Sequence, residues 1–297
     1  MKKTEADRKE TKKNTSRKKS RKRKRVSRIL SDILLVVLIV VFVYSAYHFY
    51  LAYREYKTGD ERYEQINEAI VVLDDTAQTQ ETSAETGSEE TAAEDESTAV
   101  SAPALEIDYA ALKAQNSDFV GVLYIPALGI YYPMAQSHDN DEYLHHLFTG
   151  EENVYGCIFL DKDANRDWTS LNSFIYGHNM KNGSMFGTLK RFEREEGLCD
   201  SDPYVYIYTE QRVYKYHIFS YYQCLKDDPL YQGVSNEEEY DKFVADSQSK
   251  SEYTRTTDTW QDDFSNRPPL ITLSTCVNVG ETYHFIVVAA LVGTTEQ

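Results

Sequence analysis

The sequence predicts a mainly β domain, a barrel or a sandwich, that follows one membrane-spanning helix and an acidic disordered linker. Three observations predict this organisation. They are a charge-free apolar run near the N-terminus, a tract rich in Ser, Thr, Ala and Glu, and eight short segments of Tyr and β-branched residues. Such residues favour the half-buried pleated surface of a sheet. At 297 residues the chain can bury a core without a disulfide framework.

The N-terminal segment is strongly basic. Residues 1–28 hold 15 Lys or Arg and three acidic residues, a net charge of +12, whereas the whole chain carries −16. Such a run could bind nucleic acid. However, an apolar stretch follows it directly, and the cytoplasmic flanks of membrane helices carry an excess of Lys and Arg. We therefore expect residues 1–28 to be a cytoplasmic arm, and we expect no nucleic-acid partner.

A membrane anchor is predicted at residues 29–53. Ile33 to Tyr53 contains no Asp, Glu, Lys or Arg, and a helix of that length, rising about 1.5 Å per residue, crosses a hydrocarbon core of about 30 Å. A cleaved signal peptide is the alternative, although the apolar stretch is long and no small-x-small cleavage site follows it. With the basic arm inside, we expect a single-pass plasma-membrane protein whose remaining residues face outward.

Two further segments separate the anchor from the folded domain. Residues 54–73 place apolar side chains at helical spacing and are expected to form a juxtamembrane helix. Residues 74–104 contain no Lys, Arg or aromatic residue. Because such a composition cannot bury enough apolar surface to offset its ordering entropy, we expect an acidic, disordered tether. The folded domain is expected at residues 105–295.

The folded domain is predicted to consist of strands with few helices. A short helix is expected at Asp108–Gln115, and a clearer one at Ser235–Gln248, which opens with capping residues and acids. The eight expected strands are Val120–Pro126, Ile130–Pro133, Cys157–Leu160, Ser173–Tyr176, Tyr204–Tyr208, Val213–Phe219, Leu270–Ser274 and Phe285–Val292. This number of short strands is typical of a barrel or a sandwich.

One cysteine has the position that a nucleophile needs. Cys276 ends an apolar strand next to a loop, so its thiol would be rigidly held and reachable. A buried core thiol is the commoner role of a lone cysteine. Cys157, Cys199 and Cys224 form no metal-type spacing with it. Since no spacing indicates zinc or an EF-hand, we expect no metal and no cofactor.

His178 is the candidate partner of that thiol. It also lies just past a strand end, after Gly177, which permits a close backbone approach. A neutral imidazole beside a thiol can take its proton, and the imidazolium then stabilises the thiolate. A histidine that only completes a loop or a core is the alternative. Asn278 could orient His178 or cap the loop.

Several motifs together resemble those of class B sortases. In order, the sequence contains YIP at 124–126, YPMAQS at 132–137, GCIFLD at 156–161, IYGHNM at 175–180, SMFG at 184–187 and TLSTC at 272–276. The YGHN-M and TLSTC elements are specific as a pair, and the helix at Ser235–Gln248 resembles the helix inserted in class B members. The resemblance covers about Asp108 to Val292. It implies an eight-stranded sortase-like β-barrel with an outward-facing active site.

The resemblance also implies an activity. In that family a cysteine thiolate cleaves a C-terminal sorting signal after Thr and forms a thioacyl-enzyme. An amine of a peptidoglycan precursor or of another protein then takes the surface protein. Cys276 and His178 match the catalytic pair. Four positions match the lining of the family's substrate groove: Asn140, Leu144, Tyr176 and Ser274.

One position departs from the family pattern. Sortases carry an arginine on the strand after the nucleophile, where it steadies the substrate carbonyl or oxyanion. Here His284 stands at that position and no arginine follows Cys276. A histidine lacks the forked guanidinium. Three interpretations stay open. His284 replaces the arginine, another arginine such as Arg255 reaches the site, or the protein is a slow or inert peptide-binding module. Arg267 is expected near the opposite end of the domain.

Overall fold

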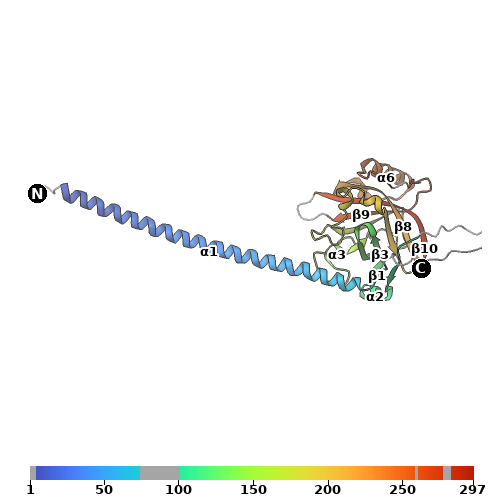
Figure 1. Cartoon of the computed structure of the whole chain (residues 1–297), viewed down its shortest axis with the longest axis horizontal. Helices are drawn as coiled ribbons and strands as arrows, with labels where there is room; N and C mark the ends of the chain where they lie inside the picture. Colours follow the sequence, from blue (N-terminus) through green and yellow to red (C-terminus); the bar gives the residue numbers. More distant parts are fainter. Residues whose placement is uncertain (1–4, 74–100, 258–259, 277–281) are drawn as a thin grey trace, which may run out of the picture. The chain divides into compact units, whose positions relative to one another are not determined.

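Eight strands close into the β-barrel of this protein (Figure 1). The computed structural model describes residues 5–73, 101–257, 260–276 and 282–297, with residues 5–29 and Cys276 described by their backbone alone. The barrel strands are β3 (Phe119–Ile125), β4 (Ile130–Ala135), β5 (Ile158–Leu160), β6 (Asn172–His178), β7 (Tyr204–Tyr208), β8 (Arg212–Leu225), β9 (Leu270–Cys276) and β10 (Tyr283–Glu296). All eight expected strands are thus confirmed, and the barrel is confirmed over the sandwich.

The pairing of the strands decides which loops share one end of the barrel. The strand order is β10-β8-β7-β3-β4-β5-β6-β9, closing on β10. β4 pairs with β5 and β6 with β9 in parallel, and the other neighbours pair antiparallel. Because β6 and β9 run in the same direction, their last residues lie at the same end of the barrel.

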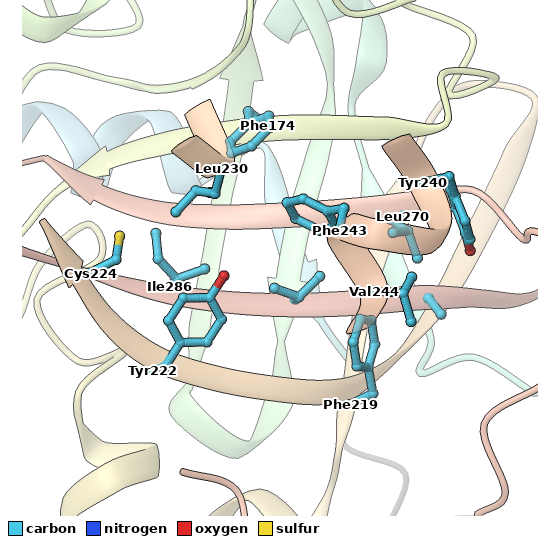
Figure 2. Close-up of a cluster of buried hydrophobic side chains, with 12 residues drawn as sticks. Phe174, Phe219, Tyr222, Cys224, Leu230, Tyr240, Phe243, Val244, Leu270 and Ile286 are labelled. Atoms are coloured by element: carbon cyan, nitrogen blue, oxygen red, sulfur yellow. The ribbon is translucent and has the colours of Figure 1, made fainter. Parts of the chain in front are cut away.

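Helix α6 (Glu237–Lys250) lies between β8 and β9 in the chain and packs against β8, β9 and β10 (Figure 2). Phe243 and Val244 of α6 join Tyr222 of β8, Leu270 of β9 and Ile286 of β10 in one buried cluster. The helix begins after Asn236, whose side chain accepts a hydrogen bond from the Glu239 N–H at 3.0 Å. The helix expected at Ser235–Gln248 is therefore confirmed, displaced by two residues.

Smaller elements complete the domain. α2 (Tyr109–Gln115) begins at Asp108, whose side chain accepts from the Ala111 N–H at 2.8 Å. The remaining short helices are η2 (Pro126–Leu128), α3 (Glu142–His145), α4 (Arg191–Arg194), α5 (Leu198–Ser201) and η3 (Pro229–Gln232).

The N-terminal part is one long helix, α1 (Glu5–Asn67). Within the described residues, its Leu30–Asn67 part is the one helix long and apolar enough to cross a membrane. The expectation of a helix up to residue 73 was wrong at its end. Ile70–Val72 form strand β1, which pairs antiparallel with β2 (Leu105–Ile107), because consecutive β-branched residues favour a strand. Of the linker expected at residues 74–104, residues 74–100 lie outside the described residues.

The chain divides into two compact units, Met1–Lys57 and Thr58–Gln297. The last turns of α1 therefore belong to the same unit as the barrel. Tyr63 and Ile66 of these turns are 4% and 1% exposed, so this part of α1 buries side chains within the second unit.

We predict that Phe243→Ala lowers the free energy of unfolding by about 3 kcal/mol or more, because it leaves a cavity between α6 and the barrel. Urea denaturation in detergent measures this loss. Lys242→Ala, on the exposed side of the same helix, is the control and should change the midpoint little. Equal midpoints for the two variants would contradict the packing of α6.

Candidate active site

Strands β6 and β9 bring His178 and Cys276 together. Their parallel register runs from Asn172 beside Leu270 to His178 beside Cys276, the last residue of each strand. Neighbouring strands lie about 4.8 Å apart. Two residues from distant parts of the sequence therefore become adjacent at one end of the barrel.

Strand β10 adds His284 on the other side of Cys276. β10 pairs antiparallel with β9 up to Ile286 beside Ser274. His284, two residues before Ile286, contacts the carbonyl oxygen of Thr275, the residue next to Cys276. The Phe285 N–H donates to Thr275 Oγ1 at 2.8 Å, which holds the two strands together at this point. The three candidate catalytic residues thus occupy one row across three adjacent strands.

Backbone groups fix the imidazole of His178. Its Nε2 lies 2.7 Å from the carbonyl oxygen of Leu144. Since a carbonyl only accepts, Nε2 carries a proton and Nδ1 is the basic nitrogen of the neutral ring. Burial lowers the pKa of His178 below its usual value, while the hydrogen bond to Leu144 raises it in part and nearby His145 lowers it further. A neutral ring of this kind is ready to accept a proton.

Gly156 makes room for that ring. Its φ is +55°, and a Cβ there would lie 2.9 Å from His178 Cδ2 and 2.6 Å from the Tyr143 carbonyl oxygen. Both the backbone conformation and the available space therefore require glycine. The backbone of the segment before β5 can therefore pack directly against the imidazole. The sequence did not indicate this packing role for Gly156.

His284 is also held by a backbone carbonyl. Its Nδ1 contacts the Thr275 carbonyl oxygen, so Nδ1 carries a proton. Its ring lies 5.3 Å from the ring of Tyr231. Burial lowers the pKa of His284, and the bond to Thr275 opposes this in part. In the neutral ring Nε2 is then an acceptor, and only the imidazolium can donate from Nε2.

The two arginines considered as substitutes are held elsewhere. Arg267 contacts Asp241 at 2.9 and 2.8 Å and Glu237 at 3.0 Å, both on α6. Arg255 pairs with Asp262. Asp262 in turn lies 3.4 Å from His217.

The position of His217 shows how far the Arg255–Asp262 pair lies from the candidate site. It stands beside Ala290 on β10, six residues from His284, or about 20 Å along a strand. The interpretation that another arginine such as Arg255 reaches Cys276 was therefore wrong. Arg267 precedes the start of β9, at the opposite end of this strand from Cys276, as expected.

The other three cysteines are poor nucleophiles. Cys157, Cys199 and Cys224 are buried thiols outside any disulfide. Burial raises the pKa of Cys157 to about 12 and that of Cys224 to about 11, so both stay protonated thiols near neutral pH. Cys276 is left as the candidate nucleophile.

Asn140 and Tyr176, two expected groove residues, meet at a third residue. Asn140 Nδ2 and the Tyr176 hydroxyl donate to Asp161 Oδ2 at 2.8 and 3.0 Å. The Lys162 N–H donates to Asn140 Oδ1 at 2.9 Å. Asp161, a residue to which sequence reasoning assigned no role in the site, thus fixes both side chains.

Ser274 and Leu144 have different roles in the structure. The hydroxyls of Ser274 and Tyr231 lie 2.7 Å apart, and Leu144 supplies the carbonyl that holds His178. Tyr231 also contacts His284. Sequence reasoning missed Tyr231 because no motif contains it. A cavity of about 400 Å³ is lined by residues that include Asp161, Tyr176 and Tyr231.

Metal ligands do not gather in the described part of the chain. Among residues 5–73, 101–257, 260–276 and 282–297, no group of three or more His, Cys, Asp or Glu is placed to hold a metal ion. Asn278 lies outside the described residues.

Comparison with known proteins identifies the family. The family model for the sortase domain matches residues 123–292. The chain belongs to the sortase family.

The relatives of this sortase belong to class B. It is 33% identical over 166 residues to sortase B of Listeria monocytogenes, covering 56% of this chain and 65% of that protein, a little under two thirds of its length. It is 26% identical over 184 residues to sortase B of Staphylococcus aureus, covering 61% of this chain and 73% of that protein.

Solved structures agree. Sortase B of Clostridium perfringens is similar with a TM-score of 0.55 and 33% identity, over 62% of this chain and 98% of that one. Sortase B of Bacillus anthracis in complex with AAEK1 is similar with a TM-score of 0.52 and 31% identity, over 62% of this chain and 83% of that one. The Staphylococcus aureus sortase B–substrate complex gives 0.55 at 23% identity, over 62% and 84%, and supports the fold alone.

We predict that the sortase loses stability as the pH falls below about 6.5, in part through His284. A histidine whose folded pKa is lowered binds fewer protons than in the unfolded chain, so the free energy of unfolding rises with pH in this range. His284→Gln should therefore lose less stability than the natural protein between pH 7.5 and pH 5, as measured by urea denaturation. His138→Gln, which alters an exposed side chain, should behave like the natural protein. A steeper loss in His284→Gln would contradict the sign.

Proposed function

We propose that the protein is a class B cysteine transpeptidase that cleaves a C-terminal sorting signal after Thr and attaches the surface protein to an amine. The observation that carries this proposal is the β6–β9 register, which sets His178 beside Cys276. Paired residues on neighbouring strands point to the same face of a sheet. Cys276 and His178 are therefore neighbours across these two strands.

The protonation state of His178, with a proton on Nε2 and a basic Nδ1, suits this chemistry. Nδ1 takes the proton of the Cys276 thiol, and the Leu144 carbonyl keeps accepting from Nε2–H in both charge states. The thiolate attacks the Thr carbonyl carbon, and the oxygen becomes an oxyanion. When the C–N bond breaks, His178 gives its proton to the departing amine and a thioester remains on Cys276. An acceptor amine attacks the thioester carbonyl and gives a proton to Nδ1 of His178. The C–S bond breaks, the thiolate leaves, and the Cys276–His178 pair is restored.

The cavity beside the row is the proposed place for the sorting signal. Asp161 orders Asn140 and Tyr176, and Tyr231 contacts Ser274. A preformed cleft of this kind orients an extended peptide before the chemical step. Tyr176 lines this cavity, and Asn140 and Ser274 contact its lining residues Asp161 and Tyr231. On these contacts, and on the contact of Leu144 with His178, we assign the substrate-contacting roles to Asn140, Leu144, Tyr176 and Ser274.

We further propose the topology in which the enzyme works. Residues 29–53 anchor the chain with residues 1–28 in the cytoplasm, since positive charge stays inside. Residues 74–104 then act as a tether, and the catalytic domain at 105–295 faces the cell wall. In that compartment it meets surface proteins with sorting signals and the amine of a peptidoglycan precursor.

A second candidate function has one specific observation in its favour. The neutral ring of His284 presents an acceptor at Nε2, so it lacks the donor that would stabilise an oxyanion. A sortase-like module with this defect binds the signal and turns it over slowly or not at all. Turnover by the natural protein separates the two candidates.

We predict that Cys276→Ala and His178→Ala each abolish cleavage of a sorting-signal peptide, because the first removes the nucleophile and the second its base. Cleavage by the full-length protein in detergent is followed by liquid chromatography. Cys199→Ala, which changes a buried thiol on α5, is the control and should keep its activity. Full cleavage by Cys276→Ala would rule out the mechanism.

We predict that His284→Arg raises kcat at pH 7.5 by about tenfold or more. One oxyanion donor is worth about 10²–10³ in rate, and a guanidinium donates at every pH where the enzyme is folded. His138→Arg adds the same charge at an exposed position and should leave kcat unchanged. An unchanged or lower kcat in His284→Arg would show that the histidine already serves as well as an arginine.

A further inference from the structure

The last turns of α1 carry a tyrosine that reaches the wall of the active site. Tyr63 is 4% exposed, and its hydroxyl donates to the carbonyl oxygen of Gly156 at 2.7 Å. Its ring packs edge-on against Tyr132 and stacks on Tyr155, at centroid distances of 5.4 and 6.3 Å. The ordinary pKa of a phenol is about 10, so this hydroxyl keeps its proton and donates near neutral pH.

Gly156 is also the residue that touches His178. A Cβ on Gly156 would lie 2.9 Å from His178 Cδ2 and 3.0 Å from the Leu144 carbonyl oxygen, which accepts from Nε2. One residue therefore stands against the imidazole, against its hydrogen-bond acceptor, and against the Tyr63 hydroxyl. A shift of Gly156 would disturb both the position of the ring and its access to water.

A second set of contacts joins the same turn of α1 to the segment after His178. Asp60 Oδ1 accepts from the Tyr155 hydroxyl at 2.6 Å and from Asn182 Nδ2 at 3.3 Å. The Phe186 N–H, a few residues on, donates to the His178 carbonyl oxygen at 2.9 Å. The last turns of α1 thus contact both the segment that contains Gly156 and the segment that follows His178.

We propose that Tyr63 is a positioning residue for His178, acting through its hydrogen bond to Gly156. This inference rests on the proposed function, and it makes the helix that leads from the anchor part of the active-site support. Removing the hydroxyl leaves the buried Gly156 carbonyl without this hydrogen-bond partner, which favours a shift of the backbone there. A misplacement of about 1 Å in a catalytic group can cost about 10² in rate. We therefore expect an intermediate loss on removal of this one hydroxyl.

The test is Tyr63→Phe in the full-length protein in detergent. We expect kcat for a sorting-signal peptide to fall about tenfold while KM stays within about twofold, because the groove residues are unchanged. We also expect the pKa of His178 to rise toward its ordinary value of about 6.5, because a looser wall admits water to the ring. Nuclear magnetic resonance of ¹³C-labelled histidine, with His178→Gln to assign the signal, measures this pKa without turnover.

Tyr208→Phe is the matched control. Tyr208 is 2% exposed, and its hydroxyl donates to the Pro103 carbonyl oxygen at 2.6 Å, on β7 and away from the β6–β9–β10 row. It loses the same type of bond, so it should lower stability without moving kcat or the His178 titration. All measurements are made below the lower unfolding midpoint of the two variants.

The outcomes separate this inference from the proposed function. An unmoved His178 titration in Tyr63→Phe, or equal kcat values in the two tyrosine variants, overturns the positioning role. If the natural protein does not cleave any sorting-signal peptide, the proposed function fails, and the His178 titration alone still decides whether Tyr63 positions the imidazole.

Discussion

The parallel pairing of β6 with β9 is the constraint on which the site depends. Both strands end at the same end of the barrel, and their last residues, His178 and Cys276, are register partners. A slip of one residue would turn one of the two side chains to the opposite face of the sheet. The buried cluster under α6, which contains Phe174 of β6 and Leu270 of β9, opposes such a slip because it would expose apolar side chains.

Hydrogen bonds to backbone carbonyls determine the chemical character of each histidine. Leu144 accepts from Nε2 of His178 and leaves Nδ1 as the base, whereas Thr275 takes the Nδ1 proton of His284 and leaves an acceptor at Nε2. The same residue type therefore suits proton transfer at one position and serves poorly as an oxyanion donor at the other. Arg255 and Arg267 form ion pairs with Asp262 and Asp241, away from the site. Of these three residues, His284 is therefore the one that stands where other sortases carry the arginine.

The sequence predicted the strands well because Tyr and β-branched residues mark them locally. It also placed Cys276 and His178 correctly at strand ends, because apolar strand segments that run into polar loops can be recognised in the sequence. It could not predict Gly156, Tyr231 or Asp161 as supports of the site. Their roles arise from contacts between segments far apart in the chain. The end of α1 was misplaced because helical spacing near Ile70 competed with its pairing to β2, which only the tertiary structure reveals.

The central claim is that Cys276 forms a thioester with the sorting signal after His178 has removed its proton. Mass spectrometry of the intact protein, quenched in acid during incubation with a sorting-signal peptide, tests this most directly. The account predicts an adduct equal to the peptide up to and including Thr, located on Cys276 and absent from His178→Ala. An adduct on another cysteine, or peptide cleavage without any adduct on Cys276 at the earliest quench times, would contradict it.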